Sequence, residues 1–288
     1  MSTGANVGLF STLTSTGSRA LLSTITAACA QGRLPGVRAA FVFCNREAGE
    51  SALTDETVGL LEEGGTRVIR ASAARFQREA RLEARRREAG GDSEPMWAWR
   101  DAFFASYRRL LPDTDLDLLL GDMWIWGRRQ CAERRGVNLH PALPSGPLGK
   151  MWFDVVWDLV ASDARISGVI LHRVTPDVDR GPVVSWCAYS LRTADLVPLW
   201  ASLPDCVQER SALIATQRAL KRDATHPLFL ALRARGLARE LPLMLETVRA
   251  VADGRLCLEG RRVVDAAGRV LPDGLDLTDD VERSVGRA

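Results

Sequence analysis

Two polar side chains flank a single leucine directly before a proline: Asn138 and His140, followed by Pro141. An amide and an imidazole can both donate hydrogen bonds to an oxygen on which negative charge develops, which is the main requirement of acyl-transfer catalysis. In a strand, residues two apart point to the same side, and a proline tends to stop the strand. Taken alone, however, an Asn-x-His pair is more often part of a turn or a satisfied polar pair in a core.

A second group of polar residues follows the apolar segment 167–171. It consists of His172 and a tight loop that contains Asp177 and Asp179 before Gly181 and Pro182. Carboxylates in loops are usually solvated turn formers. The position favours function here, because we expect segment 167–171 to form a strand beside the one that carries Asn138.

A third candidate is the turn at residues 15–19, which opens the first predicted helix. Gly17 allows a ligand to approach closely, and the free amides of a helix N-terminus attract anions. The turn therefore predicts a phosphate cradle made by Thr16, Gly17, Ser18 and Arg19. An ordinary serine or threonine N-cap explains the same pattern equally well.

The elements that must position these residues form an α/β pattern. Short apolar segments alternate with helical periodicity, which predicts a mostly parallel sheet flanked by helices. The order strand, helix, strand, helix, strand occupies the first 71 residues, and two further strands precede Pro141. The five predicted strands lie within residues 7–12, 37–45, 66–71, 115–126 and 136–144. Ligands in such folds bind beyond the carboxyl ends of the strands, where Asn138 and His140 would lie.

Length and composition exclude several classes of protein. The 288 residues have 46% hydrophobic content and a formal charge of +2, which is a globular balance without the excess of basic residues typical of nucleic-acid or membrane-surface binding. Segment 74–91 is rich in Arg and Glu, but the interleaved signs predict a solvated helix supported by pairs such as Glu83 with Arg87. No apolar run is long enough to span a membrane, and no secretory signal precedes the first strand. Six scattered cysteines without a C-x-x-C pair predict reduced thiols, no metal site and a cytoplasmic protein.

Together, the segments "NLHPALPSGP" and "SGVILHRVTPDVDRGPVV" resemble the 10-formyltetrahydrofolate-dependent formyltransferases, in particular the glycinamide ribonucleotide transformylase branch. In that family, an Asn-x-His-Pro segment and a Val-Thr-x-x-x-Asp-x-Gly-Pro loop build one active site. The resemblance implies a Rossmann-like formyltransferase fold, catalysis by Asn138, His140 and Asp179, and no metal. It assigns to Asp179 the role of stabilising the protonated imidazole of His140.

The resemblance also implies binding residues. The family's folate-binding segments correspond to Gly121, Asp122, Met123, Trp124 and Ile125, and to Thr175, Pro176 and Asp177. "TSTGSRALL" is similar to the family's phosphate-binding turn, and Glu240 falls on its ribose-contacting glutamate. The implied co-substrate is 10-formyltetrahydrofolate, and the implied acceptor is a small primary amine that can carry a phosphate.

The chain departs from the family pattern in three ways. Its phosphate turn has Ser15, Thr16 and Arg19 where the family usually carries Gly and Asn around its Gly-Ser. The segment "ALPSGPLGKMW", residues 142–152, replaces the family's Ser-Leu-Leu-Pro and its following aromatic-Pro-Gly. Helical inserts are predicted at about residues 74–109 and 196–231 of a single domain that spans 1–288. We expect these differences to affect the amine acceptor more than the formyl donor.

Three functions follow from these residues. The first is N-formyl transfer to glycinamide ribonucleotide or another small amine, by a monomer or homodimer without nucleic-acid or membrane partners. The second is hydrolysis of the same donor, as in related deformylases. The third is folate binding without catalysis. Formylation of methionyl-tRNA is disfavoured, because the chain has no clear barrel-like tail at its C-terminus and little excess positive charge.

Overall fold

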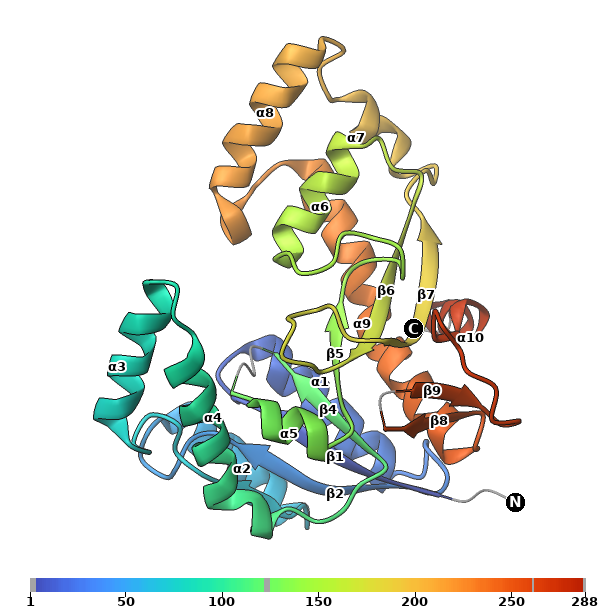
Figure 1. Ribbon diagram of the computed structural model, residues 1–288. Helices are drawn as coiled ribbons and strands as arrows, with labels where there is room; N and C mark the ends of the chain where they lie inside the picture. The colour runs from blue at the N-terminus through green and yellow to red at the C-terminus, as the bar shows by residue number, and fades with distance from the viewer. Residues whose placement is uncertain (1–3, 122–124, 261, 287–288) are drawn as a thin grey trace. The chain divides into compact units, whose positions relative to one another are not determined.

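A computed structural model describes residues 4–121, 125–260 and 262–286 of the chain (Figure 1). Contacts divide the chain into two compact units. Unit 1 comprises residues 1–138, 173–178 and 248–270, and unit 2 comprises residues 139–172, 179–247 and 271–288.

Unit 1 has the strand–helix alternation that the sequence predicts. Its elements are β1 (Ala5–Ser11), α1 (Thr16–Ala30), β2 (Val37–Cys44), α2 (Ala52–Glu63), β3 (Val68–Arg70), α3 (Arg78–Ala89), α4 (Glu94–Tyr107), η1 (Arg108–Leu110), β4 (Leu116–Leu120), α5 (Arg128–Glu133), β8 (Leu256–Glu259) and β9 (Arg262–Asp265). The five predicted strands are confirmed as β1 to β4 and β5 (Gly136–His140), which crosses from unit 1 into unit 2. Helix α5 was not predicted, because its six residues are too few to show a helical period.

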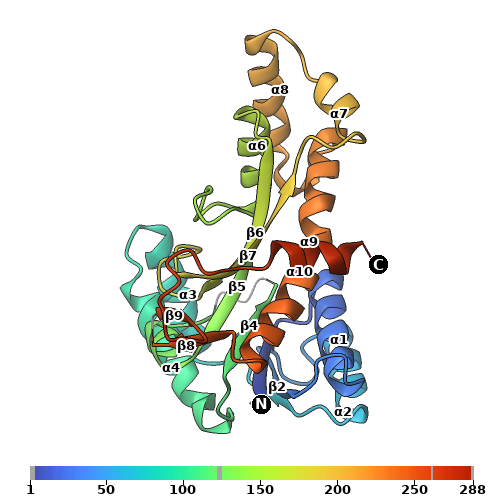
Figure 2. The same cartoon turned by 90° about the vertical axis from the view of Figure 1, so that its right-hand side faces the viewer.

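The strands form an eight-stranded sheet in the order β10-β7-β6-β5-β4-β1-β2-β3. The pairs β1–β2, β1–β4, β2–β3 and β4–β5 are parallel, whereas β6–β7 is antiparallel. The predicted fold class, a mostly parallel sheet flanked by helices, is therefore confirmed. In unit 1, α1 and α2 lie on one side of the strands and α3 and α4 on the other (Figure 2).

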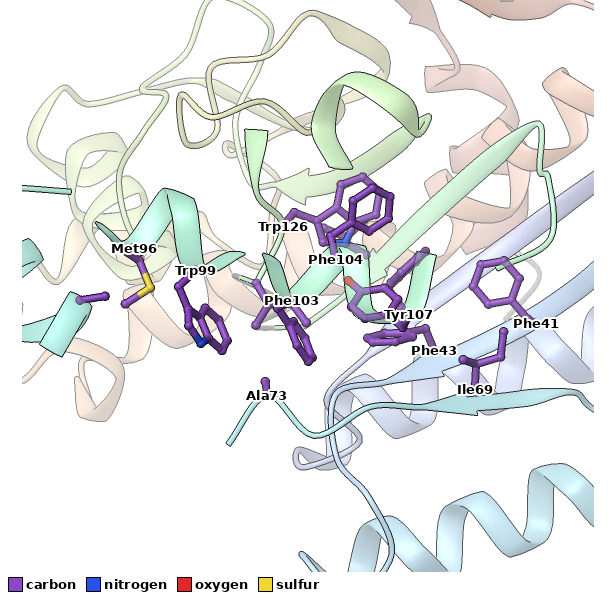
Figure 3. Close-up of a cluster of buried hydrophobic side chains, with 14 of the residues drawn as sticks. Phe41, Phe43, Ile69, Ala73, Met96, Trp99, Phe103, Phe104, Tyr107 and Trp126 are labelled. Atoms are coloured by element: carbon purple, nitrogen blue, oxygen red, sulfur yellow. The ribbon is translucent and has the colours of Figure 1, made fainter. Parts of the chain in front are cut away.

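An aromatic cluster forms the core beneath α4. The helix buries Trp99, Phe103, Phe104 and Tyr107 in one cluster with phenylalanines of β1 and β2. Figure 3 shows Phe43 of β2 beside Tyr107, with ring centroids 4.3 Å apart. Trp99 and Phe103 stack with ring centroids 5.3 Å apart and planes at 11°. Burying such side chains contributes about 1.5–3 kcal/mol each, so α4, within the predicted insert, is an integral part of the core of unit 1.

Helix α3 differs from α4 because only Ala84 among its residues is buried. This exposure agrees with the predicted solvated helix. The ion pair differs in detail, since Glu83 pairs with Arg86 at 2.6 Å and not with Arg87.

Unit 2 is built on the antiparallel pair β6 (Ile166–Arg173) and β7 (Val183–Ser190). Its remaining elements are α6 (Trp152–Ala161), α7 (Val197–Ala201), α8 (Val207–Ala219), η2 (Lys221–Asp223), most of α9 (Pro227–Ala252), β10 (Leu275–Asp276) and α10 (Thr278–Val285). Trp157 of α6 stacks on Phe229 of α9 with centroids 5.1 Å apart. Helix α9 continues through Pro242, although a proline normally ends a helix. Across the described ranges, no helix has the length and apolar character needed to cross a membrane.

Candidate functional site

Strand β5 presents the predicted polar pair at its carboxyl end. Asn138 is half-buried and His140, the last residue of the strand, is 3% exposed. Alternation along the strand places both side chains on the same face. Pro141 lacks the backbone N–H needed to extend the strand, so the chain turns there as predicted.

The structure brings His140 and Asp179 of unit 2 together. His140 Nδ1 lies 3.5 Å from Asp179 Oδ2, and the carboxylate is only 10% exposed. Asp179 has a left-handed backbone (φ 53°), a conformation that is uncommon for residues other than glycine and recurs at functional sites. The loop geometry thus supports the pairing that the resemblance implied.

A second histidine, His172, contacts the same carboxylate. Its Nε2 lies 3.3 Å from Asp179 Oδ1, and its side chain is 3% exposed. The sequence placed His172 beside the loop that carries Asp179 but gave it no role in catalysis or binding. Its position near the carboxyl end of β6, the strand that neighbours β5, was the available signal. The third histidine, His226, has a different environment: burial lowers the pKa of its ring, and its Nδ1 accepts a hydrogen bond from Leu228 N at 3.3 Å.

The two histidines set the charge of Asp179. Burial opposes ionisation of this carboxyl group, but its contacts with the rings of His140 and His172 outweigh the effect of burial. The pKa of Asp179 is therefore held well below its ordinary value of 3.8, and the group is a carboxylate at neutral pH.

The other ring nitrogen of His140 is also engaged. His140 Nε2 lies 2.9 Å from the carbonyl oxygen of Pro147, which can only accept, so Nε2 is the donor. The carboxylate of Asp179 is likewise an acceptor, and a ring that carries protons on both nitrogens satisfies both partners. Pro147 belongs to segment 142–152, which departs from the family pattern. In this structure, the Nε2–H of His140 is therefore directed at the protein's own backbone.

The turn after β1 holds the predicted anion-binding residues of unit 1. Ser15 caps α1, since its Oγ accepts a hydrogen bond from Ser18 N at 3.1 Å, so the N-cap interpretation is confirmed. Thr16 and Gly17 are exposed, Arg19 is half-buried, and a Cβ at Gly17 would meet no atom within 4 Å. The turn begins at Leu13, which is fully buried and has φ 54°, a strained conformation for a leucine.

Gly121 of the predicted folate segment lies against this turn. A Cβ on Gly121 would lie 3.1 Å from the Cβ of Ser18, and the glycine has φ +77°. Two predicted binding segments of unit 1 are thereby brought together. Ile125 packs into the aromatic core, whereas Asp122, Met123 and Trp124 lie outside the described residues.

The loop after β6 contains the other predicted folate-binding residues. Thr175 Oγ1 donates to the carbonyl oxygen of Asp177 at 2.9 Å, which closes a tight turn. Pro176 is half-buried and Asp177 is exposed.

Glu240, the predicted ribose contact, is 9% exposed in α9 of unit 2. Arg233 Nη1 donates to its Oε1 at 2.6 Å, and the same guanidinium lies 4.7 Å from the ring centroid of Trp152. The carboxylate is therefore already paired within its own helix.

A basic side chain follows Asp179 directly. Arg180 is exposed, and a Cβ on Gly149 would lie 2.9 Å from its Nε, so its guanidinium lies over segment 142–152. Arg180 makes no ion pair within the part of the chain that the structure describes, unlike Lys150, which pairs with Asp158 at 2.6 Å. A search of the described residues for three or more His, Cys, Asp or Glu side chains able to hold a metal ion finds none.

Comparisons with known proteins were made by sequence and by structure. No family model matches the chain, and no curated protein matches it. Solved structures do match. Phosphoribosylglycinamide formyltransferase from Coxiella burnetii has a TM-score of 0.57 and 17% identity, and the match covers 95% of this chain and 99% of that chain.

Two further matches extend the comparison. Formyltetrahydrofolate deformylase from Burkholderia mallei has a TM-score of 0.51 and 16% identity, with 92% of this chain and 70% of that chain covered. Phosphoribosylglycinamide formyltransferase from Anaplasma phagocytophilum has a TM-score of 0.50 and 16% identity, covering 95% of this chain and 98% of that chain. The implied fold is confirmed: the chain has the fold of the phosphoribosylglycinamide formyltransferases and formyltetrahydrofolate deformylases.

Proposed function

We propose that this protein is a divergent 10-formyltetrahydrofolate-dependent formyltransferase that acts on a small primary amine. The observation that carries the proposal is the contact between His140 and the carboxylate of Asp179, at the carboxyl end of β5 in a fold that known formyl-transferring enzymes share. Fold alone does not define chemistry, so the assignment rests on this pair.

The reaction joins the amine nitrogen to the formyl carbon and breaks the bond from that carbon to N10 of the folate. A tetrahedral intermediate with a negatively charged oxygen forms between these events. Asn138 donates a neutral hydrogen bond to that oxygen, and the imidazolium of His140 donates a charged one, each worth about 10²–10³ in rate. The attacking amine loses one proton and N10 gains one, and the carboxylate of Asp179, with His140 and a water molecule, passes it.

The contact from His140 Nε2 to Pro147 adds a step to this mechanism. His140 exchanges the carbonyl of Pro147 for the oxyanion when substrates bind, which requires segment 142–152 to shift. The carbonyl meanwhile orients the ring and satisfies its Nε2–H in the buried site.

The remaining residues bind the two substrates. We assign the folate to Gly121–Ile125 and Thr175–Asp177, and an anionic group of the acceptor to Thr16, Gly17, Ser18 and Arg19. Glu240 contacts a sugar hydroxyl of the acceptor through the carboxylate oxygen that Arg233 does not occupy. The insert at 74–109 of unit 1 and segment 142–152 of unit 2 each influence which amine is accepted, and the natural amine differs from glycinamide ribonucleotide.

Gly17 allows a clean test of the acceptor site. Because a side chain at this position meets open space, Gly17→Ala leaves the fold intact, and Gly17→Val should raise the KM for the acceptor while the affinity for folate changes little. Equal damage to both ligands would show that the turn is structural.

Hydrolysis of 10-formyltetrahydrofolate is the second candidate, favoured by the similarity to the Burkholderia mallei deformylase. The two functions separate when the full chain is incubated with 10-formyltetrahydrofolate, with and without a panel of amines that includes glycinamide ribonucleotide. A transferase releases tetrahydrofolate only with an amine and forms a formylated product. A hydrolase releases formate without any amine, and a non-catalytic binder releases neither product.

A further inference from the structure

The amino-terminal edge of the sheet in unit 1 carries a pocket of about 540 Å³. It lies where β1, β2, β4 and β5 begin, together with the C-terminal end of α9 and strand β8. Asn138 and His140, which are assigned to catalysis, lie at the opposite, carboxyl end of β5. A volume of this size is typical of small-molecule sites.

Four consecutive strands of the sheet each contribute one polar residue to this pocket. In sheet order these residues are Arg38 at β2, Asn6 at β1, Asp115 before β4 and Arg135 before β5. The strand register aligns them, since Asn6 pairs with Arg38, and Asp115 N donates to Asn6 O at 2.8 Å. The four side chains therefore lie along the amino-terminal edge of the sheet, side by side on neighbouring strands.

Both guanidinium groups are oriented by hydrogen bonds, and neither has a carboxylate partner among the described residues. Arg38 Nε donates to Asn6 Oδ1 at 3.0 Å. Arg135 Nε and Nη1 donate to the carbonyl oxygens of Leu258 and Thr114 at 3.2 and 3.1 Å. Within the described ranges, neither arginine forms an ion pair, whereas Arg134 beside them binds the buried carboxylate of Asp117 at 2.6 Å.

The arginine nitrogens that have no partner indicate which ligand the pocket can bind. The terminal nitrogens of Arg38 and Nη2 of Arg135 make no hydrogen bond to any described residue, and fixed guanidinium groups of this kind suit phosphate. Asp115 is an acidic residue of the pocket lining, and its Oδ2 accepts a hydrogen bond from Asn6 N at 2.8 Å, whereas its Oδ1 has no hydrogen bond to a described residue. Its second oxygen would repel a phosphate but would accept hydrogen bonds from hydroxyl groups. A ligand that carries a phosphate and several hydroxyl groups satisfies both the arginines and Asp115.

We propose that this pocket binds a small sugar phosphate or mononucleotide, with the phosphate on Arg38 and Arg135 and the sugar hydroxyls on Asp115. The site is separate from the residues assigned to formyl transfer, and the proposal does not depend on that function. A ligand bound in this pocket can act as a regulatory metabolite of the protein.

Cys257 provides a direct readout, because this exposed free thiol lines the pocket. Cys206 is an exposed free thiol of unit 2 that does not line it, so it serves as an internal control in the same chain. The rate of N-ethylmaleimide addition to each cysteine is followed by peptide mass spectrometry, with inorganic phosphate, ribose, ribose 5-phosphate or adenosine 5′-monophosphate present.

Ribose 5-phosphate or the nucleotide should slow alkylation of Cys257 at least threefold in a saturable way and leave Cys206 unchanged. Arg38→Gln and Arg135→Gln should each weaken this protection about tenfold or more, as expected for the loss of a charged hydrogen-bond donor. Arg67→Gln is the matched control, since Arg67 is also exposed and donates to a backbone carbonyl, that of Leu110 at 3.0 Å. It should change the protection less than twofold.

Asp115→Asn tests the sugar end and should remove the preference for ribose 5-phosphate over inorganic phosphate. Arg19→Gln, in the turn assigned to the acceptor anion, should leave protection of Cys257 intact. A substitution can change the alkylation rate of Cys257 even without ligand. For any such variant, calorimetric titration of the full chain with ribose 5-phosphate measures the ligand affinity independently of the thiol.

Four results would overturn the proposal. They are no protection and no heat at 10 mM ligand, equal slowing of Cys206, equal effects of Arg38→Gln and Arg67→Gln, or loss of protection in Arg19→Gln. Equal affinity of the wild type for inorganic phosphate and ribose 5-phosphate would overturn the role of Asp115.

Discussion

At the residue scale, Asp179 connects two histidines that lie 32 positions apart in the chain. Its carboxylate holds His140 on one oxygen and His172 on the other, so the three side chains act as one unit. Removing the carboxylate leaves two buried imidazoles without their shared acceptor. Asp179→Asn should therefore reduce single-turnover formyl transfer about as much as His140→Ala does.

The double variant distinguishes a coupled pair from independent residues. Residues that act together are strongly non-additive, so Asp179→Asn with His140→Ala should be little slower than either single variant. The rates are normalised to folded protein by thermal melting. Penalties that multiply in the double variant would rule out the coupled mechanism, and lost stability with full activity per folded molecule would make the pair structural.

The depressed pKa of Asp179 also predicts how stability depends on pH. A carboxyl group whose pKa is lower in the folded than in the unfolded state stabilises the fold. This contribution is fully present when the pH lies well above the ordinary pKa of 3.8. That contribution is lost as the pH falls toward the folded-state pKa, because the unfolded chain then binds the proton first. The difference in free energy of unfolding between wild type and Asp179→Asn should thus shrink between pH 5 and pH 3 in urea titrations. A constant difference over this range would contradict the depressed pKa.

At the element scale, α4 carries a buried and a half-buried tryptophan two residues apart. Trp99 is 4% exposed, stacks on Phe103 and donates its Nε1–H to Phe76 O at 3.2 Å. Trp97 on the same helix is half-buried, with the guanidinium groups of Arg100 and Arg128 at 4.7 and 5.3 Å from its ring centroid.

This contrast gives a matched pair of variants. Trp99→Ala should lower the free energy of unfolding by about 3–5 kcal/mol, because it leaves a cavity in the aromatic core. Trp97→Ala should cost about 1 kcal/mol or less, the value of exposed cation–π contacts. Both are measured by chemical denaturation. Equal losses would mean that the cluster around Trp99 is not the core of unit 1.

The elements themselves were largely predictable. Strands β1 to β5 are short apolar segments bounded by turn residues, and α6 shows clear helical periodicity, so local sequence was sufficient for them. Strand β10 was missed, since its two residues have no period and become a strand only by pairing with Ser185 and Trp186 of β7, about 90 positions earlier. Local sequence does not predict the continuation of α9 through Pro242, because a proline normally ends a helix.

At the scale of the whole molecule, binding of a folate should stabilise the protein by mass action. A ligand at 100 times its Kd adds about 2.7 kcal/mol to the stability of the state that binds it. For a chain of this size, the Tm should rise by about 5–10 °C with a stable folate analogue such as 10-formyl-5,8-dideazafolate. Differential scanning fluorimetry checks this shift. p-Aminobenzoylglutamate, which lacks the pterin ring, is the control, and an equal shift with both compounds would contradict a specific folate site.

The sequence by itself determined the α/β class, the strand that carries Asn138 and His140, and the loop that carries Asp179. These features depend on apolar periodicity, on proline and glycine, and on residue spacing, all of which act locally along the chain. The tertiary structure alone decided that His172 joins the carboxylate of Asp179 and that the carbonyl of Pro147 occupies Nε2 of His140. Each of these is a contact between side chains or backbone groups whose direction no local pattern encodes, because it depends on how strands, loops and helices pack in three dimensions.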